Sequence, residues 1–392
     1  MSLTSGLGSP QTPLRRFLDR ELSAGTRPLR ANYRARLATP HLVLPGEGVG
    51  NEAGTVGTAV DQRLRLAFTT ADPVDLATRA GVLLSDEYAS EPDLYGHRAH
   101  VNTVLAALGR ELIAAITALV ADLALDDRSR PLTRVDEDEE RLARMLLVAA
   151  WYALRYRVPI AFPETPLFKA VIADPGGFTL PRMLAIPHHD LVDDVLAQLD
   201  LAQHGPLAAL RSASTPNRCH PGPTFDGSHH VTADADLIVD GLLLDFKSTR
   251  RIHDFPQLTM QQLLGYALMD YGDHYEIDAV GVYLTRAGAL VSWPVEDYLH
   301  LLGARRRDLS DFRTVFASLL SHPACPADSV PTPEQRIIVD HLLAELATRI
   351  ARGCCPVCGT GLDDAAHRMR RRYCSPHCAN RAPTLRRHGW LG

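Results

Sequence analysis

A turn signal in the middle of the chain constrains the fold more than any other feature. Asp240 and Gly241 lie between the apolar runs "LIV" and "LLLDF". This dipeptide favours a two-residue type I′ turn, because both of its positions tolerate a positive φ. The sequence therefore predicts a β-hairpin in which Val239 faces Leu242.

That register gathers charged side chains on one face of the hairpin. It places Asp236 opposite Asp245 and Asp234 opposite Lys247. Because side chains alternate between the faces of a strand, Asp236, Asp245 and Lys247 project to the same side. Opposed carboxylates repel each other and require a compensating cation. Lys247 supplies part of that charge, and a divalent ion with oxygen ligands would supply the rest. The alternative is an exposed hairpin with an ordinary Asp–Lys ion pair.

Lysine is rare in this chain, which draws attention to position 247. Of the 41 lysines and arginines, only Lys169 and Lys247 are lysine. Arginine is a planar, permanently charged fork, whereas lysine is a compact donor whose pKa the protein can tune. A lysine at position 247 therefore indicates chemistry that arginine cannot perform, with a leftover surface charge as the alternative.

These residues resemble a known family. Asp236, eight intervening residues and then Asp245-Phe246-Lys247 are similar to the motif of the PD-(D/E)XK nuclease superfamily, especially its RecB-like exonuclease branch. One departure is Ala235, which stands where the motif has proline. The resemblance implies that the two acids bind Mg²⁺ or Mn²⁺, with the Phe246 carbonyl as a further ligand. It also implies that Lys247 orients or activates the attacking water.

Two further stretches carry the same resemblance. "QQLLGYALMD" places Gln262 and Tyr266 one helical turn apart, like the Gln-x-x-x-Tyr helix beside the metal site of RecB-like nucleases. The resemblance gives Gln262 a role in orienting water or substrate, and Tyr266 a role in bracing the helix or touching phosphate. "VGTAVDQRLRLAF" (56–68) resembles their upstream helix, but Asp61 stands where they have histidine. Asp61 is therefore a candidate third metal ligand or a plain surface residue.

The rest of the chain reads as mostly helical around a short α/β segment. We expect β-strands within 231–295 and helices near 57–68, 101–125, 137–157, 187–203, 258–272, 296–320 and 333–351. The expected fold class is α/β, a restriction-endonuclease-like core with a small mixed sheet flanked by helices. The expected nuclease domain is 1–350, with core segments about 56–68 and 225–320 and a helical insertion about 70–215. Residues 351–392 are the expected zinc-binding module.

The tail is rich in cysteine. Five of the seven cysteines lie within 354–378, and two close pairs are separated by fifteen residues: Cys355 with Cys358, and Cys374 with Cys378. Such pairs fit a structural Zn²⁺ site with four thiolates. Cys354 and His377 are alternative ligands, and an iron–sulfur cluster is the alternative cofactor. The tail resembles bacterial treble-clef modules.

The tail is also basic, although the whole chain carries a net charge of −5. Arginines there could contact phosphates without reading sequence. The alternative is a small stapled cap that docks on the helices or on a partner. The candidate nucleic-acid-binding residues are Arg368, Arg370, Arg371, Arg372, Arg386 and Arg387.

The resemblance implies a metal-dependent DNA nuclease, working in bacterial DNA repair or in defence against phage. A non-catalytic DNA-binding or assembly protein of the same fold and an RNA nuclease are the alternatives. The chain contains no ATPase P-loop, so a helicase partner would be a separate chain. No uninterrupted apolar run reaches a bilayer span of about 18 residues, and no apolar leader is visible at the N-terminus. We therefore expect a cytoplasmic protein without membrane association.

Overall fold

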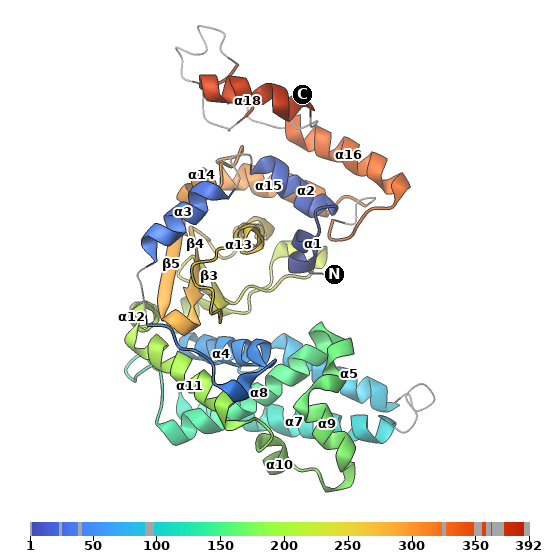
Figure 1. The fold of residues 1–392 in the computed structure, drawn as a ribbon, viewed down its shortest axis with the longest axis vertical. Coiled ribbons are helices and arrows are strands. Elements are labelled where there is room, and N and C mark those ends of the chain that lie inside the picture. The colour runs from blue at the N-terminus through green and yellow to red at the C-terminus, as the bar shows by residue number, and fades with distance from the viewer. Residues whose placement is uncertain are drawn as a thin grey trace.

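The structure is a computed structural model that describes residues 2–22, 26–37, 41–90, 98–323, 327–348, 355–357, 362 and 372–387. It shows a mixed α/β architecture, with one five-stranded sheet between two groups of helices (Figure 1). The strands are β1 (Cys219–Pro221), β2 (Leu237–Val239), β3 (Leu242–Lys247), β4 (Ala279–Leu284) and β5 (Ala289–Pro294).

The sheet confirms the predicted hairpin register. Val239 pairs with Leu242, and the turn residues Asp240 and Gly241 have φ angles of 48° and 83°, as a type I′ turn requires. The strand order is β1-β2-β3-β4-β5, and every neighbouring pair is antiparallel except β3 with β4. The helix α13 (Gln257–Met269) makes the crossover that a parallel pair needs.

One face of the sheet is covered by helices from the first half of the chain. Their apolar side chains share one core with Leu237, Leu244, Phe246 and Tyr283 of the sheet. The acidic run that opens α8 fills its first turn, where carboxylates favour the helix dipole. These helices are α4 (Ala53–Phe68), α5 (Leu76–Ser90), α7 (Arg98–Leu123), α8 (Asp136–Arg157), α9 (Pro166–Ala173), α10 (Leu180–Leu184), α11 (His189–His204) and α12 (Pro206–Ala213).

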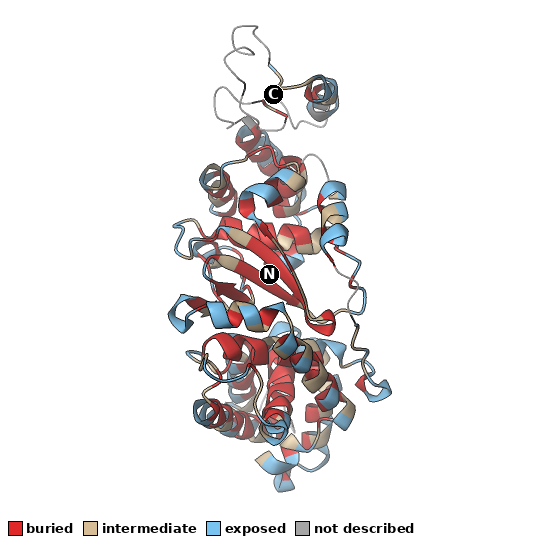
Figure 2. Ribbon diagram, turned by 90° about the vertical axis from the view of Figure 1, so that its left-hand side faces the viewer, coloured by how far each residue is buried: buried red, intermediate tan, exposed pale blue. Residues whose placement is uncertain are grey.

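The opposite face of the sheet is covered by both ends of the chain. Ile238, Leu243, Val280 and Val291 share a second core with these helices, so the strands are buried on both sides (Figure 2). The helices are α1 (Leu3–Gly8), α2 (Pro13–Glu21), α3 (Arg27–Arg36), α13, α14 (Val295–Leu301), α15 (Leu309–Leu320) and α16 (Pro333–Thr348), and α18 (Pro376–Arg387) lies in the tail. Short 3₁₀ turns are η1 (Glu47–Val49), η2 (Pro159–Glu164), η3 (Pro175–Gly177), η4 (Pro216–Arg218), η5 (Asp226–His229) and η6 (Thr285–Ala287).

Two predictions about local structure were wrong in detail. The single helix expected over 296–320 is two helices, because the chain turns at Gly303, whose φ is 63°. The hairpin ladder ends at Leu237, so Asp234 does not reach Lys247 but forms a bridge with Thr224.

The segment His100–Leu123 of α7 has the length and apolar composition that a membrane crossing would need, and its most apolar window of 18 residues has a mean hydropathy of 1.9. In this structure, 44% of that segment's most apolar window is buried inside the protein. Leu105, Leu112 and Ile116 lie in the core of the helical group.

Candidate metal site at the hairpin

Acidic and basic side chains meet where α4 passes the hairpin. Asp61 and Arg65 come from consecutive turns of α4, Asp236 precedes β2, and Asp245 and Lys247 project from β3. The Lys247 Nζ atom lies 2.7 Å from Asp245 Oδ2. The structure thus brings together the residues that the sequence predicted on one face of the hairpin.

Asp236 is held beside β3 by a main-chain donor. Its Oδ2 atom accepts a hydrogen bond of 2.6 Å from the Phe246 N–H. The ladder between β2 and β3 ends at Leu237, so the Phe246 N–H has no main-chain partner on β2. The Asp236 carboxylate takes the place of that partner. The contact fixes the first acid at the edge of the strand that carries the second acid.

Arg65 joins the cluster, and the sequence analysis missed it. Its Nη2 atom donates to Asp236 Oδ1 at 2.9 Å, and its guanidinium forms a two-point ion pair with Asp61, with Nε 2.7 Å from Oδ1. The Arg65 side chain is only 9% exposed. The i, i+4 spacing of Asp61 and Arg65 was a signal for the first contact. The second contact joins positions 171 residues apart, and no local pattern predicts it.

Burial and neighbouring charges shift the pKa values of Asp245 and Lys247. Burial raises the pKa of Asp245 to about 6, although Lys247 works in the opposite direction. Burial lowers the pKa of Lys247, but Asp245 and Asp236 raise that pKa by more, so it lies above its ordinary value. The Lys247 ammonium is therefore a proton donor at neutral pH and not a base. Its side chain is 33% exposed, against 4% for Asp245, so the cluster opens to solvent at the lysine.

The helix α13 presents the predicted polar pair. Gln262 Nε2 donates to Tyr266 Oη at 2.7 Å, and also reaches Thr4 Oγ1 at 3.3 Å. Burial, together with the Asp245 and Asp236 carboxylates, raises the pKa of Tyr266 well above its ordinary value. The Tyr266 phenol therefore stays protonated near the carboxylates.

A helix from the segment 70–215 supports the chain just after Lys247. The buried Gln198 of α11 accepts hydrogen bonds from Ser248 Oγ at 2.9 Å and Thr285 Oγ1 at 2.6 Å. Both hydroxyls belong to segments that leave the sheet at the same end, after β3 and after β4. This segment is thus packed into the site region and does not form a detached unit.

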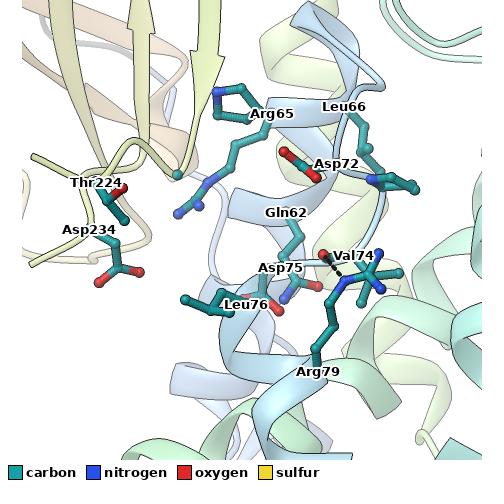
Figure 3. A pocket seen from close by; sticks show the side chains of 13 residues that line it. Gln62, Arg65, Leu66, Asp72, Val74, Asp75, Leu76, Arg79, Thr224 and Asp234 are labelled. Carbon is teal, nitrogen blue, oxygen red and sulfur yellow. Dashed lines mark hydrogen bonds between the residues drawn. The ribbon is translucent and has the colours of Figure 1, made fainter. Parts of the chain in front are cut away.

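A cavity of about 270 Å³ adjoins the cluster on the side of Arg65 (Figure 3). Three aspartates line it, Asp72, Asp75 and Asp234, together with Arg65 and Arg79. Asp234, which the sequence placed opposite Lys247, points into this region and pairs with Arg157 at 3.5 Å. Because Asp234 pairs with Arg157 and Arg65 pairs with Asp61 and Asp236, the remaining lining charges are Asp72 and Asp75 against Arg79, a slightly acidic balance that disfavours phosphate.

The tail brings three cysteines together. The Sγ atoms of Cys355, Cys374 and Cys378 all lie within 4.8 Å of one another, so the group can hold a metal ion and is compatible with a structural zinc site. The expected fourth ligand, Cys358, lies outside the described residues. The buried Arg305 donates to the Pro356 carbonyl at 3.0 Å and ties this cluster to the body of the protein.

Only part of the arginine set in the tail can be placed. Arg372 and Arg386 lie in the described residues, and Arg386 Nη2 donates to Tyr373 Oη at 2.5 Å. The structure describes the backbone of Arg387 but not its side chain. Arg368, Arg370 and Arg371 lie outside the described residues. Nucleic-acid binding by these residues stays a prediction.

Among the described residues, one other group meets the same 4.8 Å spacing: His188, His189 and Asp190 at the start of α11. The three carboxylates Asp61, Asp236 and Asp245 do not, because Arg65 lies between Asp61 and Asp236. A carboxylate has about four acceptor positions, so Asp236 can still coordinate a cation while it accepts two hydrogen bonds. Binding of a divalent ion by Asp236 and Asp245, with Asp61 or the Phe246 carbonyl as a further ligand, therefore stays a prediction.

The chain matches no known protein-family model, no curated protein and no solved structure. The interpretation of the site accordingly rests on the residues and contacts described above.

Proposed function

We propose that this protein is a metal-dependent phosphodiesterase that acts on DNA. The observation that carries the proposal is the partly buried group of Asp236, Asp245 and Lys247 at the hairpin, beside the Gln262–Tyr266 pair. In support, α4, the hairpin and α13 come in the order that the resemblance to RecB-like nucleases implies, although the helices within 76–213 lie between α4 and the hairpin.

Asp236 and Asp245 would hold Mg²⁺ or Mn²⁺, with the Phe246 carbonyl as a further ligand. Bound there, the ion would lower the pKa of its water and neutralise charge on the phosphoryl oxygens. Asp61 would be available as a ligand only if Arg65 released it, because its carboxylate is engaged by that guanidinium. Arg65 would then be free to approach the negative charge of the phosphate.

Lys247, Gln262 and Tyr266 would act as hydrogen-bond donors to the nucleophile or the substrate. Lys247 is an ammonium, so it would stabilise the hydroxide nucleophile as a hydrogen-bond donor. Gln262 would orient the water or the DNA backbone, and its hydrogen bond to Tyr266 fixes the direction of both side chains. The protonated phenol of Tyr266 would brace the helix or donate to a phosphate oxygen.

Cleavage of supercoiled plasmid in Mg²⁺ or Mn²⁺ tests this proposal. We expect cutting by the wild-type protein, and at least a hundredfold loss for Lys247→Ala and Asp245→Asn, since each removes a group at the reacting centre (about 3 kcal/mol or more). Lys169→Ala is the matched control, because Lys169 is exposed and pairs only with Glu164 among the described residues. Equal cutting by all three variants would show that the hairpin cluster is not the active site. A matched RNA substrate distinguishes a DNA nuclease from an RNA nuclease.

A second candidate function is a DNA-binding or assembly protein without catalysis. Arg65 favours it, because the guanidinium already compensates Asp61 and Asp236 as a divalent ion would. In that case DNA would bind equally well with and without Mn²⁺ and would never be cut. Cutting that is lost with Lys247→Ala would exclude this alternative.

For the tail we propose a structural zinc site formed by Cys355, Cys358, Cys374 and Cys378, three of which the structure brings together. The biological setting we propose is bacterial DNA repair or defence against phage, in the cytoplasm, with any helicase or ATPase supplied by a separate chain. This setting is inferred from the superfamily alone.

A further inference from the structure

A second and larger cavity opens on the other side of the cluster, immediately after Lys247. It has a volume of about 630 Å³ and lies between two segments of the chain. Ser248, Thr249, Arg250 and Arg251 form one wall, and residues 45–53 form the other. No motif in the sequence analysis pointed to it.

The cavity is placed along α4 relative to the candidate metal site. Ala53, the first residue of α4, lines the cavity. One turn later, Gly57 packs against Ser248, since a Cβ at Gly57 would lie 3.4 Å from Ser248 Cβ. One further turn leads to Asp61 in the charged cluster. The two cavities therefore flank the cluster, with Arg250 and Arg251 on one side and the three aspartates on the other.

The charge of this cavity is the opposite of that in the first. Arg250 and Arg251 are exposed, and within the described part of the chain no acidic side chain pairs with either guanidinium. Arg286 also lines the cavity, but its charge is compensated by the buried Asp194, at 2.7 Å. Glu47 is the acidic residue in the lining. Two uncompensated arginines against one lining carboxylate leave the lining positive, although the Asp190 carboxylate accepts a hydrogen bond from the Gly48 N–H behind the other wall.

The positive region continues beyond the cavity along α3. Tyr33 and Arg34 of α3 bond to the carbonyls of Ile252 and His253, which follow the two arginines. This helix carries four arginines and no acidic residue. A mainly basic surface thus extends from the end of β3 over the neighbouring helix, with the exposed Asp254 beside Tyr33 as an acidic member.

We propose that the cavity between 45–53 and 248–251 binds the phosphodiester backbone of the DNA strand next to the phosphate at the candidate metal site. Exposed guanidinium groups bind phosphate oxygens in two-point contacts, which suits Arg250 and Arg251 to this role. The Gln198 hydrogen bond to Ser248 holds the start of the loop that carries them. This inference rests on the proposed function. It implies that the DNA strand reaches the candidate metal site through the basic cavity and not through the aspartate-lined cavity.

The test measures binding of a fluorescent single-stranded DNA over a series of salt concentrations, in a Lys247→Ala background with Mg²⁺ so that no cutting occurs. Replacing both Arg250 and Arg251 by alanine should weaken binding at low salt. It should also make the slope of log K against log salt shallower by about 1.4, because each lost phosphate contact contributes about 0.7 for a single strand. Replacing both arginines by lysine should restore most of the slope, which a folding defect would not allow.

The matched control removes the same charge from the helical group, by Arg110→Ala with Arg182→Ala, two exposed arginines on α7 and α10. That variant should keep the parental slope. An unchanged slope for the Arg250/Arg251 variant, when the parent binds DNA, would overturn the cavity assignment alone. Saturable binding of inorganic phosphate that depends on these arginines, again with an unchanged DNA slope, would make the cavity a small-anion site instead. Failure of the parent to bind DNA at all would instead contradict the proposed function.

Discussion

At the scale of single residues, Arg65 and Lys247, the two cations of the cluster, have different environments. Arg65 is a buried planar fork that bridges the carboxylates of Asp61 and Asp236. Within the residues that the structure describes, Lys247 forms an ion pair with Asp245 only, and a third of its side chain is exposed. Arginine suits a fixed bridge, whereas a compact ammonium at the open side can approach water or substrate. This difference gives a physical reason for lysine at position 247 in a chain whose other cations, apart from Lys169, are arginine.

The raised pKa of Asp245 predicts how stability depends on pH. The folded state keeps a proton on Asp245 up to about pH 6, whereas the unfolded chain loses it near pH 4. The contribution of Asp245 to the free energy of unfolding should therefore fall as the pH rises through this window and then level off. Asp245→Asn removes that titration, so the wild type should lose roughly 3 kcal/mol at most relative to the variant between pH 4 and 7.

Urea unfolding of the wild type and of Asp245→Asn at several pH values measures this difference. The contributions of the other carboxylates are largely the same in both proteins and cancel in the difference. The opposite trend, in which the wild type gains stability over the variant as the pH rises, would mean that Lys247 outweighs burial. The Asp245 carboxylate would then be ionised well below pH 6.

At the scale of elements, the turn at Asp240-Gly241 positions the site. A Cβ at Gly241 would lie 2.8 Å from the Glu276 carbonyl, on a backbone whose φ of 83° already disfavours any other residue. We expect Gly241→Ala to destabilise the protein by about 1–3 kcal/mol and to weaken Mn²⁺ binding through a disturbed register. Gly54→Ala in α4 is the matched control, because a Cβ there meets no atom within 4 Å.

Thermal unfolding and Mn²⁺ titration of the two glycine variants check this prediction. The control should keep the wild-type stability or exceed it by about 0.5–1 kcal/mol, since alanine favours a helix over glycine. A Gly241→Ala protein as stable as the control, with unchanged Mn²⁺ affinity, would show that the turn does not govern the site.

The elements also show what the sequence could and could not predict. Strong local patterns sufficed for the hairpin, for α13 (expected over 258–272) and for α8 (expected over 137–157). The strand β1 was missed because it has three residues, ends in Pro221 and lies in a turn-rich stretch. The helices α1 to α3 were missed because they are short and depend on packing against the second core.

At the scale of the whole molecule, the sheet joins two cores, and the site lies where contacts from distant segments converge. Asp61 and Arg65 approach from α4, Gln198 supports the loop from α11, and Gln262 lies on α13. Such contacts depend on the tertiary fold, which is why local spacing predicted the hairpin residues but not Arg65 or Gln198.

The tail adds a prediction at this scale. Because Arg305 binds the Pro356 carbonyl beside Cys355, loss of a metal from the cysteines should loosen the tail from the body. We expect Cys374→Ser to lose bound zinc and to expose the tail to limited proteolysis, with the body intact. Zinc analysis of the purified protein, with Cys219→Ser as the control, checks this. Equal zinc content in both variants would contradict a site at the cysteine cluster.

Deletion of 352–392 separates the two proposed DNA-binding surfaces. If the arginines of the tail contact phosphates, the deletion should weaken DNA binding and make its salt dependence shallower, while Mn²⁺ binding at the hairpin is retained. An unchanged affinity across the salt series would identify the tail as a docked cap.

The most direct measurement is a crystal structure of the protein soaked in Mn²⁺, with anomalous diffraction recorded at the metal. If this pair binds the metal, we expect anomalous density between the carboxylates of Asp236 and Asp245, within about 2.0–2.3 Å of an oxygen of each. Density elsewhere, or none at saturating Mn²⁺ with Arg65 still bridging Asp61 and Asp236, would contradict metal binding by this pair.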